Sequence, residues 1–129
     1  MKTGSKAQVL RIYIGTYDKH GHQPMYEHIV FEAKKYGIAG ASVFRGVLSY
    51  GANSIVHSAK ILELSADLPL IIEMVDTKEK IESFIEHLSD IHEHDNFGGL
   101  ITTYEVEIVK YKAHKNGKVR DMENINNGE

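Results

Sequence analysis

The sequence predicts an α+β protein with the element order β-α-β-β-α-β, in which an antiparallel sheet carries both helices on one face. Two segments place apolar residues at helical spacing, at 24–36 and 76–91. Apolar strands with period-two alternation or continuous apolar runs flank both segments, and glycine, proline and aspartate separate them. A chain of 129 residues is long enough to form one domain with its own core.

The first predicted strand spans residues 8–15, where Leu10, Ile12 and Ile14 alternate with Val9, Arg11 and Tyr13. A polar loop follows at 17–23. Pro24 then begins a helix, because proline suits the first helical position. Gly37 ends that helix as a C-terminal stop.

A second strand covers roughly 39–49, and a polar loop occupies 51–60. We expect a short third strand at 61–64 and a turn at 65–69. A fourth strand follows at 70–75.

The second helix begins at Asp76, which forms a pair with Glu79 like that of a capping box. Its apolar face is Ile81, Phe84, Ile85, Leu88 and Ile91. Residues 95–99 break the helix, and the last strand runs from Leu100 to Tyr111 with Tyr104, Val106 and Ile108 on one face. This order is that of the ferredoxin-like fold.

The predicted domain is residues 8–112, between a flexible N-terminus at 1–7 and a disordered tail at 113–129. The chain has no cysteine, which excludes disulfides, thiolate metal sites and cysteine nucleophiles. We expect a cytoplasmic protein, because no apolar run is long enough for a membrane span and residues 1–6 lack a signal core. The net charge of -3 and the pI near 6.2 disfavour nucleic acid as a partner.

The second face of the sheet is also apolar, because the strand at 70–75 is apolar on both sides and Val9 and Tyr13 point away from the helices. Two helices cannot cover both faces. We therefore expect copies of the chain to cover the open face in a closed homo-oligomer. The alternative is that the tail or a loop covers it.

The segment 37–51 combines small residues and glycines between a helix end and a loop. Backbone without bulky side chains can approach a ligand closely, and successive main-chain N–H groups can hold an anion. The segment matches neither of the two standard nucleotide-binding glycine motifs.

Residues 37–43, Gly-Ile-Ala-Gly-Ala-Ser-Val, resemble the Gly-Ile-Thr-Gly-Met-Thr-Val of PII nitrogen-regulatory proteins. Ser49-Tyr50-Gly51 resembles the Gly-Phe-Gly that opens their signalling loop. An uncharacterised PII-like family is more similar still, over about residues 8–112. Its pattern resembles Arg11–Gly15, Asp18-Lys19, Gly21, Pro24, Tyr26, Asp67–Pro69 and Val75-Asp76.

The resemblance implies a PII-like homotrimer with a ferredoxin-like fold that binds AMP, ADP or ATP in clefts between subunits. It implies a regulatory protein rather than an enzyme, with an adenine nucleotide as ligand and no required cofactor. A membrane or enzyme target would be engaged through the loop at 51–60.

By position, the resemblance assigns Ser42 to the nucleotide pocket, Gly51 to the loop start and Lys110 and Lys112 to the phosphate-binding Arg-x-Arg. Gly98-Gly99 matches a phosphate-contacting Gly-Lys. Lys19 lies in a polar cluster after the first strand, where the resemblance implies the nucleotide cleft. Further candidates come from the residues themselves: Arg45 beside Gly46, and Tyr50 as a stacking ring. Ser49 completes the set of nucleotide-binding candidates.

Two departures from PII reduce the positive charge and glycine content of the site, because Gly99 replaces a lysine and Ser49 a glycine. The signalling loop is also shorter. These changes favour a mono- or diphosphate nucleotide. Arg45 has an alternative role in pairing with Glu63 or Glu73 across the sheet.

The alternative function is that of a trimeric divalent-metal-binding protein of the CutA kind, with His92 and His94 as ligands. These histidines also suit a solvated helix end, where the helix dipole favours them. His20 and His22 form a second polar cluster in the loop after the first strand. A ferredoxin-like enzyme and an RNA-recognition module are disfavoured, because no acid–base set can be identified and the chain lacks a basic face.

Overall fold

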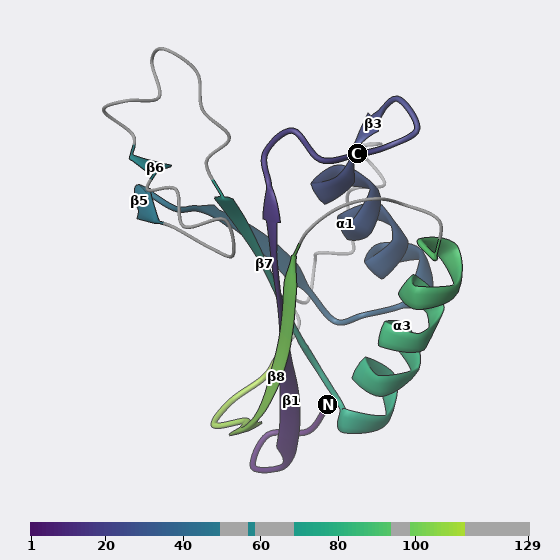
Figure 1. The fold of residues 1–129 in the computed structure, drawn as a ribbon. Coiled ribbons are helices and arrows are strands. Elements are labelled where there is room, and N and C mark those ends of the chain that lie inside the picture. Colours follow the sequence, from purple (N-terminus) through teal and green to yellow (C-terminus); the bar gives the residue numbers. More distant parts are fainter. Residues whose placement is uncertain (50–56, 59–68, 94–98, 113–129) are drawn as a thin grey trace, which may run out of the picture.

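The structure, a computed structural model, describes residues 1–49, 57–58, 69–93 and 99–112. A four-stranded antiparallel sheet has the order β4-β7-β1-β8. Its strands are β1 (Lys6–Gly15), β4 (Ala41–Arg45), β7 (Pro69–Asp76) and β8 (Leu100–Glu107). Helices α1 (Met25–Tyr36) and α3 (Lys78–Ile91) lie together on one face of this sheet (Figure 1). The predicted ferredoxin-like fold class is confirmed.

Two short strand pairs lie outside the main sheet. Strands β2 (Lys19–His20) and β3 (Gln23–Pro24) form a hairpin between β1 and α1. Strands β5 (Leu48–Ser49) and β6 (His57–Ser58) pair beyond the end of β4.

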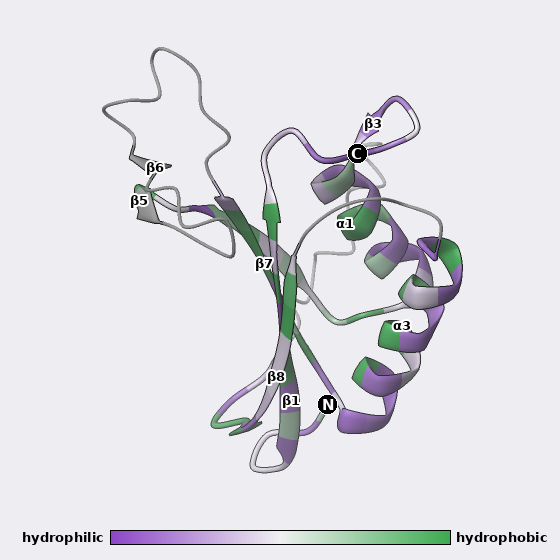
Figure 2. Ribbon diagram, viewed as in Figure 1, coloured by the Kyte–Doolittle hydropathy of each residue, from purple (hydrophilic) through white to green (hydrophobic). Residues whose placement is uncertain are grey.

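The core lies between the sheet and the two helices. The central strands β1 and β7 direct alternate residues toward the helices, and those residues are almost fully buried: Leu10, Ile12, Ile14, Leu70, Ile72 and Met74. The helices contribute Met25, Ile29, Ala33, Ile81, Phe84 and Leu88. Hydrophilic and hydrophobic residues alternate along both helices (Figure 2), as amphipathic helices on a sheet require.

Strand β1 begins at Lys6, two residues before its predicted start. Lys6 pairs with Glu107 and Ala7 with Val106. Ala7 is also buried. These two residues of the predicted flexible segment 1–7 therefore belong to the sheet, because β8 is long enough to pair with them.

The predicted single strand at 39–49 is divided in the structure. Strand β4 ends at Arg45, and the N–H of Gly46 donates to the carbonyl oxygen of Pro69 at 2.9 Å. A Cβ on Gly46 would lie 3.1 Å from Cγ of Pro69, so this close packing favours glycine. The predicted strand at 61–64 and most of the loop at 51–60 lie outside the described residues.

The cap of α3 is Thr77, not Asp76 as predicted. Oγ1 of Thr77 accepts the N–H of Lys80 at 3.2 Å. The Asp76 carboxylate accepts two other backbone N–H groups, from Thr77 at 2.7 Å and from Ala39 at 2.8 Å. Asp76 is only 6% exposed, and its bond from Ala39 ties the end of β7 to the connection between α1 and β4.

The last strand ends at Glu107 rather than at Tyr111. The N–H of Ile108 donates to the carbonyl oxygen of Ser5 at 2.7 Å, and that of Gly4 donates to the carbonyl oxygen of Ile108 at 2.6 Å. The N–H of Tyr111 donates to Oγ1 of Thr3 at 3.0 Å. Residues 108–111 leave β8 because the N-terminal residues offer them other partners, and Lys110 therefore lies outside the last strand.

A row of polar contacts joins the outer sides of α1 and α3. Nε2 of His87 lies 3.0 Å from Oε1 of Glu32, and the hydroxyl of Tyr36 bonds that of Ser83. The hydrogen bond from His87 is the main reason why the pKa of Glu32 lies below its ordinary value of 4.5. We call this row the helix seam.

Replacing Asp76 by alanine should destabilise the fold, because two backbone N–H groups lose a buried carboxylate acceptor. We expect Asp76→Ala to lower the free energy of unfolding by about 2 kcal/mol. Denaturant titration at a fixed protein concentration measures it. The exposed Asp90 of α3 is the matched control, and Asp90→Ala should change the value by less than about 0.5 kcal/mol. Equal effects of the two substitutions would contradict this role for Asp76.

Replacing Glu32 by glutamine should lower the free energy of unfolding at pH 7 by about 1 kcal/mol, because the charged partner of His87 is lost. The folded-state pKa of Glu32 is depressed, so its contribution is complete above the ordinary value of 4.5 and falls as the pH drops through the folded-state value. Denaturation of both proteins across this range measures the difference. Glu86→Gln, on the exposed side of α3, is the control. A difference that grows as the pH falls below the ordinary value of 4.5 would contradict the assignment.

Candidate functional site

The sheet face opposite the helices, which we call the outer face, is apolar. Ala7 and Val9 at the start of β1 are buried on this face, whereas much of the rest is open among the described residues. Phe44 of β4 is 51% exposed, and Leu100 and Tyr104 of β8 are 55% and 43% exposed. Tyr13 and Ile71 lie between them on the central strands and are half-buried. Contiguous exposed apolar residues of this kind are typical of protein interfaces.

An ion pair lies in the middle of the outer face. Nε of Arg11 donates to Oε2 of Glu73 at 2.8 Å, and the guanidinium lies 5.7 Å from the centre of the Tyr104 ring. Hydrogen bonds with Tyr13 and then with Glu73 hold the pKa of Arg11 above its ordinary value, so its charge is permanent. Glu73 therefore faces a fixed cation.

Glu73, one of the two partners suggested for Arg45, is paired with Arg11 instead. Strand register places Arg45 opposite Leu70 and Ser42 opposite Glu73. Successive residues of a strand point to opposite faces, so the side chain of Arg45 lies on the helix side. The other suggested partner, Glu63, lies outside the described residues.

A pocket of about 390 Å³ lies where the start of β4 meets the end of β7 and the segment after β8. It brings together two residues that the sequence assigned to nucleotide binding, Ser42 and Lys110. The remaining lining residues are Met1, Ala39, Gly40, Ala41, Glu73, Val75, Ile108 and Tyr111.

Gly40 leaves open space in this pocket. A Cβ built on Gly40 would meet no atom within 4 Å among the described residues, and its backbone is not in the left-handed region. Gly37, in contrast, has a φ of 90° and ends α1. The fold explains the glycine at 37, whereas a side chain at 40 would extend into open space.

The other candidate residues lie at two separate edges of the sheet. Arg45, Gly46 and Ser49 follow the β4 edge, whereas Gly99 directly precedes β8 at the opposite edge. Strands β7 and β1 lie between these edges, which places them about 14 Å apart. A single chain therefore does not bring all the candidates together.

The remaining candidates are only partly described. Lys19 is exposed in β2, and Lys112 is exposed beyond Lys110. Tyr50, Gly51 and Gly98 lie outside the described residues.

The histidines gather differently from the prediction. His94 lies outside the described residues, and His92 is buried at the C-terminal cap of α3. The partners of His92 are His20 and His28, whose ligand nitrogens and that of His92 all lie within 4.8 Å of one another. Sequence reasoning noted His20 but missed His28. Its position in the first turn after the His20 hairpin was the available signal.

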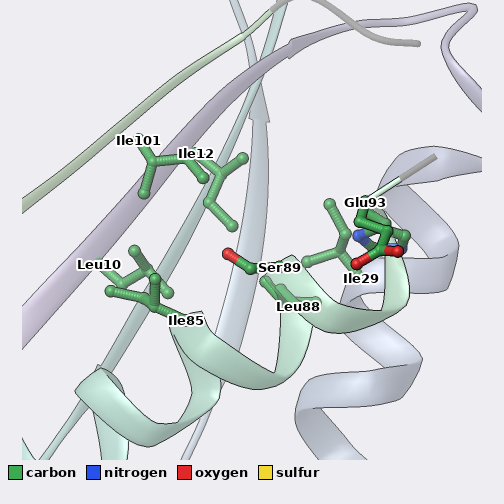
Figure 3. A pocket seen from close by; sticks show the side chains of 9 residues that line it. Leu10, Ile12, Ile29, Ile85, Leu88, Ser89, Glu93 and Ile101 are labelled. Carbon is green, nitrogen blue, oxygen red and sulfur yellow. The ribbon is translucent and has the colours of Figure 1, made fainter. Parts of the chain in front are cut away.

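A second, largely apolar pocket of about 340 Å³ opens beside this histidine group. Leu10, Ile12 and Ile101 from the strands face Ile85 and Leu88 of α3 across it (Figure 3). His92, Glu93, Ile29 and Ser89 complete the lining. The pocket therefore reaches from the sheet to the end of α3.

Neither helix of the described residues could cross a membrane, since α1 has 12 residues and α3 has 14.

Comparison with solved structures finds the same fold in PII-like proteins. CPII from Thiomonas intermedia K12, a nitrogen regulatory PII-like protein solved with ADP, AMP and bicarbonate, superposes with a TM-score of 0.58 at 12% identity. The match covers 81% of this chain and 90% of CPII. A putative PII-like signaling protein from Thermus thermophilus gives a TM-score of 0.59 at 14% identity, over 81% and 91% of the two chains.

Sequence comparison finds relatives of similar length. A UPF0166 protein from Aquifex aeolicus (strain VF5) is 33% identical over 104 residues, which is 81% of this chain and 94% of the relative. A UPF0166 protein from Methanocaldococcus jannaschii is 34% identical over 110 residues, or 85% and 98%. The model of the family DUF190, "Uncharacterized ACR, COG1993", matches residues 7–108. The chain therefore belongs to the DUF190 family, and its fold is the PII-like fold.

Proposed function

We propose that this protein is a PII-like regulator that binds an adenine nucleotide between the subunits of a homotrimer. The observation that carries the proposal is the pocket in which Ser42 and Lys110 meet beside the open space at Gly40. The fold is that of CPII, which was solved with ADP and AMP.

The distribution of the candidate residues supports a site made by two copies. The residues after β4 and the residue before β8 lie at opposite edges of the same sheet. Neighbouring copies in a closed ring can place one edge beside the other. The exposed apolar outer face supplies the driving force, because its burial is favourable at about 25 cal/mol per Å². The choice of three copies follows the PII resemblance.

The charges in the pocket favour a nucleotide with few phosphates. Lys110 lines the pocket and Lys112 follows it, so each can supply a single positive charge. The carboxylate of Glu73 also lines the pocket, but the ion pair with Arg11 offsets its charge. Gly99 supplies no cation. AMP and ADP therefore suit the pocket better than ATP.

The proposed role is binding and signalling rather than catalysis. Strand β5 lies directly before the loop at 51–60 and follows the edge strand that carries Ser42 into the pocket. Occupation of the pocket would bias the conformations of this loop, through which a membrane or an enzyme target would be recognised.

Nucleotide binding should raise the melting temperature of the protein. A ligand at 100 times its Kd adds about 2.7 kcal/mol to the free energy of unfolding per site. We expect AMP and ADP to give a larger shift than ATP and adenosine to give the smallest. Thermal melts with each ligand measure this order. Unchanged melting temperatures with all three nucleotides at millimolar concentration would refute the proposal.

Two substitutions test the pocket itself. Lys110→Ala should weaken ADP binding about tenfold, the equivalent of about 1.4 kcal/mol, because one phosphate contact is lost. Gly40→Val should abolish binding without unfolding the protein, because it fills open space. Lys34→Ala, on the exposed side of α1, is the charge-matched control. Isothermal titration with ADP would contradict the site if Lys34→Ala and Lys110→Ala weaken binding equally.

Oligomer formation should depend on the outer face. Phe44→Asp places a charge on that face and should reduce the assembly to a monomer. Phe31→Asp is the matched control, because Phe31 is 55% exposed on α1, in the opposite layer. Sedimentation velocity at micromolar concentration measures the mass. A monomeric unsubstituted protein would overturn the interface.

A further inference from the structure

A group of three histidines joins the ends of three elements on the helix side of the molecule. His20 lies in β2, His28 in the first turn of α1, and His92 at the C-terminal cap of α3. The ring centres of His20 and His28 lie 3.9 Å apart. The His92 ring lies 5.1 Å from that of His20 and 4.9 Å from that of His28.

The fold fixes each of the three positions. The hairpin that carries His20 is anchored to α1 because the N–H of Met25 donates to the carbonyl oxygen of Asp18 at 2.7 Å. The N–H of His92 donates to the carbonyl oxygen of Leu88 at 2.9 Å, which closes α3. His28 lies about one helical turn before Glu32 on α1, and His92 lies about one turn after His87 on α3. The two histidines are therefore next to the Glu32–His87 contact along the helix seam. The cluster therefore continues an ordered helix contact.

We propose that His20, His28 and His92 form a binding site for a late first-row divalent metal ion such as Zn²⁺, Cu²⁺ or Co²⁺. Imidazole nitrogen is the ligand type that these ions share, whereas Mg²⁺ and Ca²⁺ prefer oxygen. The three ligand nitrogens converge within 4.8 Å, and the Nε2 atoms of His28 and His92 are buried. Three imidazoles on one ion leave a fourth position for another ligand.

The site must tighten when it binds the ion. Nitrogens held about 2.0–2.1 Å from a tetrahedral ion lie about 3.3 Å apart. An imidazole also directs its lone pair within its ring plane. The His20 and His28 rings are stacked with planes only 14° apart, so one of them must tilt. His20 is the ring that can move, because it lies in a two-residue strand beside the turn at Gly21, whose φ is 63°.

The surroundings suit a bound cation. Glu32 lies one turn along α1 from His28, and its carboxylate interacts electrostatically with that ring. The apolar pocket lined by His92 and Glu93 approaches the cluster from the sheet side. This site lies in the helix layer, whereas the proposed nucleotide pocket opens on the outer face.

Titration with Zn²⁺ tests the proposal, with metal binding measured by calorimetry and the coordination of Co²⁺ by its visible absorption. We expect one ion per chain and a rise in melting temperature. His20→Ala and His28→Ala should each weaken binding at least about 100-fold, since even partners that only orient a ligand cost about 10–100-fold. His20→Ala keeps the test valid if His28→Ala fails to fold, because the hairpin lies outside the core.

Two control variants separate this site from other histidine sites. His22→Ala removes an exposed histidine from the same hairpin and should leave Zn²⁺ binding unchanged. His94→Ala should also leave it unchanged. If His94→Ala loses Zn²⁺ binding and His20→Ala retains it, the proposed site is wrong and the ion binds at residues 92–94. Absence of Zn²⁺, Cu²⁺ and Co²⁺ binding to the unsubstituted protein would overturn the proposal. ADP binding should persist in His20→Ala.

Discussion

Single-sided cover of the sheet is the constraint on which the rest of this structure depends. Helices α1 and α3 bury the inward residues of β1 and β7, such as Ile12 and Ile72. The same strands present Tyr13 and Ile71 on the other side, beside the exposed Phe44 and Leu100 of the edge strands. An apolar surface of this kind is unfavourable in water, and this is the basis of the proposal that further copies of the chain cover it.

The Arg11–Glu73 pair gives this outer face a defined geometry. An ion pair amid apolar residues contributes little to stability, because desolvation of its charges offsets their attraction. In the proposed assembly it would restrict how the copies can pack, since both charges must keep their partners. Glu73 of this pair lies opposite Ser42 in the strand register, which connects the proposed interface to the proposed nucleotide pocket.

The two layers offer separate binding chemistry. On the outer face, small residues and a lysine surround the space near Gly40, which suits a phosphate group. In the helix layer, the helix seam ends in three converging imidazoles, which suit a late first-row metal ion. Asp76 links the two layers. It lies at the end of β7, and its carboxylate accepts the N–H of Thr77, which caps α3, and the N–H of Ala39.

Local periodicity in the sequence determined the fold class, whereas contacts between distant segments were decided only by the tertiary structure. The alternation around Leu10 and the helical spacing from Ile81 specify which face each element buries, and the structure confirms both. These patterns depend on neighbours within a few residues, so they can be read without the fold. In contrast, packing of α1 against α3 brings His28 next to His92. The Asp76 carboxylate accepts the N–H of Ala39, and Thr77 caps α3 in its place. Sequence spacing carries no information about such pairs, because their distance is set by how whole elements pack.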